Sequence, residues 1–248
     1  MEWKRVLFLF SLIFVLSFPN ILNTAKAIDY PEIIAEKEIY GKPLEYWAQE
    51  YWKWFVTLPP GDIPKNDSTN LNQCILGTDS NNIMVFLMSS YDLTYGAKCT
   101  ISPDKPILVP LLISECDATV PEPRTKTGKI EDLWTCTRES NEGFEAWDVR
   151  LDNKVLFQKA GNIAVNAEMK DEILVRNSSL FTISYPEINR FEVEAGSYPA
   201  VVDGYYLILK PLSPGEHVLK YKISHKENIP GADLSYVSGD ATYYLTVK

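Results

Sequence analysis

The sequence predicts a mainly β protein: an antiparallel β-sandwich of the immunoglobulin-like or jelly-roll kind, with an N-terminal amphipathic helix and one short helix. Three observations lead to this prediction. Short apolar or alternating segments recur along the second half, each ended by Pro, Gly, Asp or Asn. One earlier segment repeats its apolar residues with a helical period, and four cysteines offer two disulfides.

The helical period covers residues 43–58, where the apolar side chains recur at i, i+3, i+4 and i+7. Pro43 stands at its first turn, and Pro59-Pro60 stops it. The apolar stripe is wide enough to bury the helix against a sheet. Tyr46 lies on the polar side and Trp52 at the edge of the stripe, so these two aromatics are the candidates for contact with a glycan or a protein partner.

The β segments begin after a polar loop. Residues 83–88 and 107–113 are apolar runs typical of buried strands, and residues 148–156 form a hairpin around Asp152-Asn153. Further strands are expected at 181–185, 205–210, 217–223 and 242–247. Lys220 and Lys222 alternate with apolar residues, which indicates a sheet with one face in water.

A second helix, short and carrying Cys136, is expected from the residues around Leu133. Residues 139–143 are polar and suggest a linker between two regions. We therefore expect residues 28–140 to hold the first helix and a disulfide-stapled β region. Residues 141–248 would form a β-sandwich region, either separate from the first or continuous with it.

The four cysteines favour the pairs Cys74–Cys99 and Cys116–Cys136, because each of these closes a local segment; the two other pairings stay open. The sequence has no CxxC spacing and no histidine near a cysteine, so we expect disulfides here and no metal site.

The first 27 residues have the layout of a secretory signal peptide, with a basic start, an apolar run and an Ala25-Lys26-Ala27 cleavage site. We expect cleavage after Ala27 and a secreted or cell-surface protein with no later membrane-spanning segment. Cleavage removes three basic residues and one acidic residue, which lowers the net charge from −9 to −11. Such a charge disfavours nucleic acid as a partner.

Several segments carry a resemblance to a known family: Tyr40-Gly41-Lys42, the tryptophan-rich helix, Val202-Asp203-Gly204-Tyr205-Tyr206 and the turn from Leu209 to His217. In these the chain resembles uncharacterised secreted proteins that are common in ammonia-oxidising archaea and occur in some bacteria. The likeness runs from about Tyr40 to the C-terminus. It implies secretion and a shared fold, and it brings no activity, ligand or catalytic residue.

Few residues suggest chemistry. The only histidines, His217 and His225, are too far apart along one strand to share a metal, and we expect His217 to be structural beside its turn. Glu115, Asp203, Glu216 and Asp240 are candidate members of a carboxylate pair for a hydrolase or lyase. No nucleotide or metal motif is present, so no cofactor is expected.

Two Asn-x-Ser sequons, at Asn66 and Asn177, are candidate glycosylation sites in an exported chain. Together these observations favour a secreted or envelope-associated, non-catalytic protein that binds a glycan or an envelope protein. The alternative is a secreted hydrolase or lyase that uses paired carboxylates.

Overall fold

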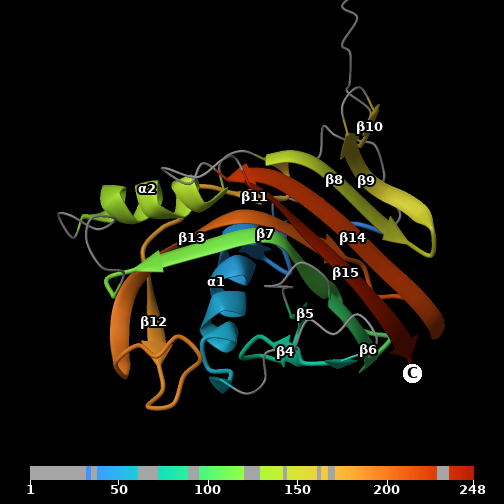
Figure 1. Cartoon of the computed structure of the whole chain (residues 1–248). Coiled ribbons are helices and arrows are strands. Elements are labelled where there is room, and N and C mark those ends of the chain that lie inside the picture. The colour runs from blue at the N-terminus through green and yellow to red at the C-terminus, as the bar shows by residue number, and fades with distance from the viewer. Residues whose placement is uncertain are drawn as a thin grey trace, which may run out of the picture.

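The computed structural model describes residues 32–34, 38–60, 72–88, 95–119, 129–141, 144–160, 163–166, 171–227 and 235–248. The expected signal peptide, residues 1–27, and the sequon at Asn66 lie outside these ranges. Within them, two helices accompany two large sheets, and a small pair is formed by β1 (Glu38–Ile39) and β2 (Lys42–Pro43) (Figure 1). Over the same ranges, neither helix has the length and apolar character needed to span a membrane.

The larger sheet, which we call the outer sheet, has seven strands. Their order is β10 (Ile163–Val165), β9 (Lys154–Ala160), β8 (Phe144–Leu151), β14 (Gly215–Glu227), β15 (Ser235–Val247), β6 (Tyr95–Ile101) and β3 (Asn72–Gln73). The hairpin between β8 and β9 turns at Asp152 and Asn153, whose φ angles are 50° and 65°. The predicted two-residue turn is therefore present, with both residues in the left-handed region that such turns require.

The second sheet, the middle sheet, contains β11 (Leu174–Val175), β13 (Gly196–Leu209), β7 (Ile107–Asp117), β5 (Val85–Leu87) and β4 (Leu76–Thr78) in that order. Strand β12 (Phe181–Tyr185) also pairs with β13. A mainly β fold is thus confirmed. The expectation of purely antiparallel pairing is wrong at β15–β6, β3–β6 and β5–β7, which are parallel.

The regions 28–140 and 141–248 share both sheets. Strand β6 lies beside β15 in the outer sheet, and β7 lies beside β13 in the middle sheet. These pairs join segments far apart in the sequence, so turn chemistry cannot indicate them. The linker expected at 139–143 also needs correction, because α2 (Ile130–Asn141) continues through its first three residues.

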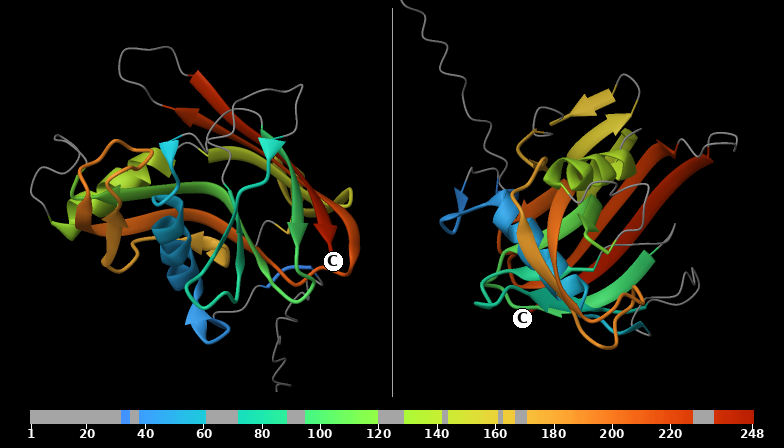
Figure 2. Two further views of the ribbon diagram at one scale, coloured as in Figure 1. Left: turned by 90° about the horizontal axis from the view of Figure 1, so that it is seen from below. Right: turned by 90° about the vertical axis from the view of Figure 1, so that its left-hand side faces the viewer.

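The middle sheet is buried on both faces. Its first face packs on the outer sheet, where Trp147 of β8 meets Tyr205 of β13 with ring centroids 5.2 Å apart. Its second face packs on α1 (Leu44–Phe55), so the layers run outer sheet, middle sheet, helix (Figures 1 and 2). Every residue of β13 from Ala200 to Leu209 is buried as a result.

Helix α1 begins after Pro43, as the sequence predicted, and lays its aromatic stripe on the middle sheet. The ring centroid of Tyr51 lies 5.9 Å from that of Phe86 and 6.4 Å from that of Tyr206. Gly77 on β4 admits this packing, because a Cβ there would lie 2.2 Å from the Trp54 ring. A glycine is therefore required where the helix and the sheet approach most closely.

The pairing of β13 with β7 contains an irregularity. Tyr205 pairs with Leu112 and Tyr206 with Pro110, which leaves Leu111 of β7 without a partner in β13, and the preceding Gly204 has φ +130°. A Cβ at Gly204 would lie 2.3 Å from the carbonyl oxygen of Leu112. Glycine is required here both by the backbone angle and by the neighbouring strand.

Two disulfides join the cysteines as predicted. Cys74–Cys99 lies beside the core between the sheets, and Cys116–Cys136 ties α2 to β7. The described part of the chain contains no free cysteine.

Because α1 closes the core of the middle sheet, removing one of its buried rings should destabilise the whole chain. Trp47 is 1% exposed, and its Nε1 donates to the carbonyl of Ile39 at 3.0 Å. We expect Trp47→Ala to lower the free energy of unfolding by about 3–5 kcal/mol in chemical denaturation. Tyr40→Ala, at a ring 56% exposed, is the control and should change it by about 0.5 kcal/mol or less. Equal effects of both variants would contradict this packing.

Candidate functional site

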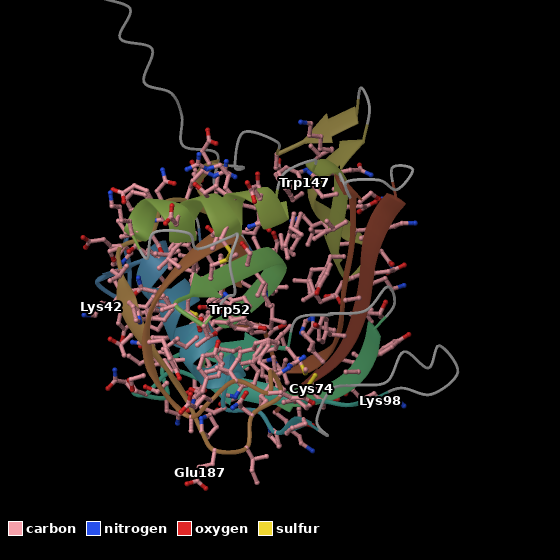
Figure 3. All side chains as sticks on the ribbon, turned by 60° about the vertical axis from the view of Figure 1, so that its left-hand side comes forward. Lys42, Trp52, Cys74, Lys98, Trp147 and Glu187 are labelled. Carbon is pink, nitrogen blue, oxygen red and sulfur yellow. A yellow bond between two sulfur atoms is a disulfide. The ribbon has the colours of Figure 1, made fainter. Side chains whose placement is uncertain are left out.

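The two aromatics selected from the helix do not form an exposed pair. Trp52 is only 2% exposed, and its Nε1 donates to the Tyr206 hydroxyl at 2.8 Å, so its expected exposure is wrong. Figure 3 shows Trp52 inside the molecule. Tyr46 is half-buried, with its ring edge-on to Trp47 at 5.1 Å and beneath the Lys42 ammonium at 4.9 Å. Helix α1 therefore packs the core and presents no aromatic strip.

The four candidate carboxylates do not converge. Asp203 lies opposite Ser114, while Glu115 lies opposite Val202, so their side chains point to opposite faces of the middle sheet. Glu216 lies opposite Thr246 on the outer sheet, and its carboxylate accepts from the Thr246 hydroxyl. Asp240 lies opposite Lys222, six residues along β14 from Glu216, or about 20 Å of strand. Glycoside hydrolysis needs carboxyl groups roughly 5–10 Å apart.

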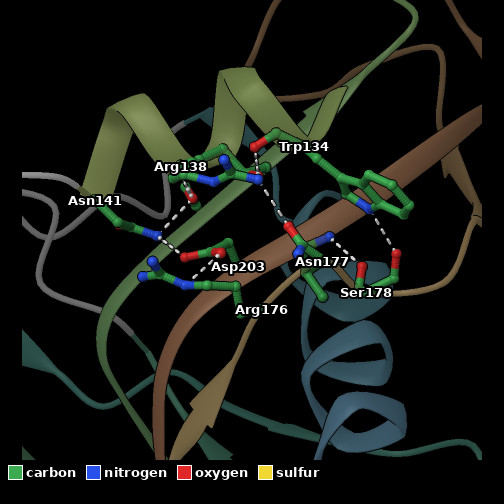
Figure 4. A network of polar contacts seen from close by, with 10 residues as sticks. Trp134, Arg138, Asn141, Arg176, Asn177, Ser178 and Asp203 are labelled. Atoms are coloured by element: carbon green, nitrogen blue, oxygen red, sulfur yellow. Dashed lines mark hydrogen bonds and ion pairs between the residues drawn. The ribbon is translucent and has the colours of Figure 1, made fainter. Parts of the chain in front are cut away.

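Asp203 is the centre of a buried network beneath α2, shown in Figure 4. Its Oδ1 accepts from Asn141 Nδ2 at 2.9 Å, and its Oδ2 lies 3.5 Å from Arg176 Nε. Asn141 Nδ2 also donates to the Ser114 hydroxyl at 2.8 Å. Burial raises the pKa of Asp203, and the Asn141 and Arg176 contacts only partly oppose that rise.

The same network anchors α2 to the segment between β11 and β12. Trp134 Nε1 donates to the carbonyl of Ser178 at 2.8 Å, and Ser178 Oγ accepts from the backbone N–H of Val202. Arg138 Nη2 donates to Asn177 Oδ1 at 3.0 Å (Figure 4). Every contact of this network joins elements of the fold, so its role is to hold α2 in place.

Asn177, the second candidate for glycosylation, is exposed at a left-handed position with φ 51°. The hydroxyl of the third sequon residue, Ser179, donates to Glu45. Glycan attachment at Asn177 stays a prediction.

A second carboxyl pair, which the sequence did not single out, lies on β7. Glu115 and Asp117 are two residues apart and face the same side of the sheet as Val202 and Ala200. In the described part of the chain, Glu115 Oε1 and Asp117 Oδ2 are buried without a hydrogen-bond partner. Burial, followed by the Asp117 charge, raises the pKa of Glu115 well above its ordinary value. Asp117 is only 1% exposed and Glu115 is half-buried with its Oε1 covered, so this pair offers little surface to a substrate.

His217 lines a pocket of about 460 Å³ together with Asp152, Lys154, Lys210 and Glu32. Its Nδ1 lies 2.7 Å from Asp152 Oδ2, and its Nε2 lies 2.9 Å from the carbonyl of Ser213. Burial alone would lower the pKa of His217, but these two acceptors raise it above its ordinary value. Both ring nitrogens are therefore occupied, which leaves the imidazole without a free atom to act as a base.

The His217 pair has a definite pH dependence. Because the pKa of His217 is raised on folding, its contribution to stability is present below about pH 6.5 and is lost as the pH rises through the folded pKa. The pKa of Asp152 is lowered by His217 against the effect of burial, so its contribution is lost as the pH falls below about 3.8. The pair connects the β8–β9 turn to the start of β14. The side chain of His225 lies outside what the structure describes.

The water-facing side of the outer sheet holds the remaining candidate. Tyr244 on β15 is 39% exposed, whereas Tyr243 and Leu245 beside it are fully buried. Tyr244 lies opposite Val218 of β14 on one side and Lys98 of β6 on the other. We call this surface the Tyr244 face and define it by Lys98, Arg150, Lys220, Thr242 and Tyr244. Lys98 lies on the outside of the molecule in Figure 3.

Cross-strand pairing defines the next row of residues on the Tyr244 face. Thr242 lies opposite Lys220, and Lys220 lies opposite Arg150 of β8. The exposed ring thus has Lys98 on one side and Val218 on the other, with the donors Thr242 and Lys220 in the next row, on a surface held by four neighbouring strands. The alternation along β15 could have identified Tyr244, because Ala241, Tyr243, Leu245 and Val247 take the other face.

The Glu115–Asp117 pair gives a prediction for stability. Because the pKa of Glu115 is raised on folding, its contribution is present at low pH and is lost as the pH rises from about 4.5 through the folded pKa. A glutamine cannot ionise, so Glu115→Gln avoids this loss of stability. It should raise the melting temperature at pH 7–8, by about 2–4 °C for each kcal/mol gained in the free energy of unfolding. At pH 4 the variant should match the wild type. Glu187→Gln, at an exposed glutamate, is the control; a lower melting temperature for Glu115→Gln at pH 7–8 would contradict this account.

Four features of the described residues bear on function: the Asp203 network under α2, the Glu115–Asp117 pair, His217 with both ring nitrogens hydrogen-bonded, and the Tyr244 face. Comparisons with protein-family models, with curated proteins and with solved structures give no match to this chain.

Proposed function

We propose that this protein is a secreted or envelope-associated, non-catalytic β-sandwich protein that binds a glycan on the Tyr244 face. One observation carries the proposal: an aromatic ring is exposed on the water-facing side of the outer sheet, with Lys98 beside it and with Thr242 and Lys220 in the next row. A sugar ring can pack its C–H face on such a ring, while its hydroxyls bind the flanking donors.

The support for binding over catalysis comes from the other sites. The four carboxylates of the alternative function lie on different faces or far apart along a strand. His217 has both ring nitrogens hydrogen-bonded, Asp117 is buried, and Glu115 is half-buried. An open sheet surface suits a polymer that lies along it, because it requires no pocket.

Secretion and cleavage after Ala27 belong to the same proposal. Two disulfides in the folded chain support an oxidising compartment. The immunoglobulin-like or jelly-roll class is proposed as well. Two facing sheets support it, while the parallel pairs β15–β6 and β5–β7 depart from the antiparallel connections of those folds.

Replacing the exposed ring tests the proposal. We expect Tyr244→Ala to weaken binding to glycans identified on a glycan array by about 3- to 10-fold, the loss of roughly 0.5–1.5 kcal/mol of ring contact. Tyr244→Phe keeps the ring and should retain binding, and Tyr40→Ala removes an exposed ring elsewhere and should have no effect. Wild-type affinity in Tyr244→Ala, with an unchanged melting temperature, would contradict the proposal.

A further inference from the structure

The Tyr244 face carries unpaired positive charge. Lys98 and Lys220 are exposed, and in the described ranges neither has a hydrogen bond or an ion pair. The chain as a whole has a net charge of −9, or −11 without residues 1–27. Cations that gather without partners on one face of an acidic protein point to a ligand that supplies the opposite charge.

The pairing of Lys220 with Arg150 strengthens this argument. The two residues lie directly opposite each other on β14 and β8. Like charges in directly opposite positions destabilise a sheet. Within the described residues Arg150 is paired with Asp148, whereas Lys220 has no hydrogen bond or ion pair. Lys220 is therefore the cation of this pair whose charge is left for an anionic ligand.

Arg150 is held in a fixed orientation. Its Nε and Nη2 donate to the two carboxylate oxygens of Asp148 at 2.7 and 2.8 Å, and Gln158 also donates to Asp148. This fork uses two of the five N–H donors of the guanidinium and leaves three for a ligand. The ion pair neutralises Arg150 and Asp148 together, so Arg150 supplies hydrogen-bond donors while Lys220 supplies the net positive charge of this row.

The acidic residues of β14 and β15 on this face occupy the rows on either side of Tyr244 and Lys220. Asp240 lies opposite Lys222, one row beyond Thr242 and Lys220. Glu216 lies opposite Thr246, one row beyond Tyr244, and its carboxylate accepts a hydrogen bond from the Thr246 hydroxyl. The excess positive charge is therefore concentrated in the two rows that contain Tyr244 and Lys220.

We propose that the glycan bound on the Tyr244 face is an acidic polysaccharide, whose carboxylate or sulfate groups bind Lys98, Lys220 and Arg150 while one sugar ring packs on Tyr244. This inference rests on the proposed function and names its ligand class. Lys98 and Arg150 lie on strands three spacings apart, about 14 Å, so a chain with repeated charges fits the face better than a single small anion. A nucleic acid is disfavoured, since its charges are far denser and the protein is acidic overall.

The test measures binding of the oxidised protein to three immobilised polymers by biolayer interferometry. Polygalacturonate carries carboxylates, dextran sulfate carries sulfates, and dextran is the neutral control. We expect binding to at least one charged polymer that weakens with added salt, and little binding to dextran. Lys220→Glu should weaken that binding at least tenfold. Lys129→Glu makes the same charge change at an exposed lysine before α2 and should weaken it less than twofold.

The outcomes separate the two proposals. If Lys220→Glu and Lys129→Glu have equal effects, or if duplex DNA binds more tightly than both charged polymers, the acidic-polysaccharide inference is overturned. If Tyr244→Ala abolishes binding to a neutral glycan while Lys220→Glu has no effect, the glycan-binding function stands and only the ligand class is wrong. If Tyr244→Ala and Lys220→Glu both bind every polymer as the wild type does, both proposals fail.

Discussion

Burial of the middle sheet on both faces is the constraint on which the rest of this structure depends. Strand β13 has no exposed residue from Ala200 to Leu209, because the outer sheet and α2 cover one side and α1 covers the other. A strand with two buried faces needs apolar residues at successive positions and a partner on each side. Side chains of β13 alternate between the two cores, and Gly204 lets the strand lie close to β7 where the register shifts.

This layering determines which surfaces stay exposed to water and can bind a ligand. The aromatics of α1 are used to cover the middle sheet, and Trp52 in particular is bound to Tyr206. Asp203 and its partners hold α2 against the end of the same sheet, with the Cys116–Cys136 disulfide beside them. The outer sheet, by contrast, has one face in the core and one in water. Its water-facing residues are free of a packing role, which makes the unpaired lysines around Tyr244 informative.

Local features of the sequence predicted much of the fold. The helix after Pro43, the Asp152-Asn153 turn and the two local disulfides each follow from residues close together in the chain. The parallel pair β15–β6 and the contact of Trp52 with Tyr206, 154 residues away, depend on the tertiary arrangement, which no local pattern encodes. The candidate site was missed for a related reason. Alternation placed Lys220 and Lys222 on a wet face, but only the register places Arg150, Tyr244 and Lys98 beside them.

The central claim is that ligand binds the water-facing side of the outer sheet and leaves the layers beneath it unchanged. Backbone amide chemical shifts of the isotope-labelled protein, titrated with oligogalacturonate or a sulfated dextran oligomer, test this most directly. The account predicts shifts concentrated at Lys98 of β6, Arg150 of β8, Lys220 of β14 and Thr242 to Tyr244 of β15, with α1 and α2 unaffected. Shifts concentrated instead around His217 and Lys154, or along α1, would contradict it.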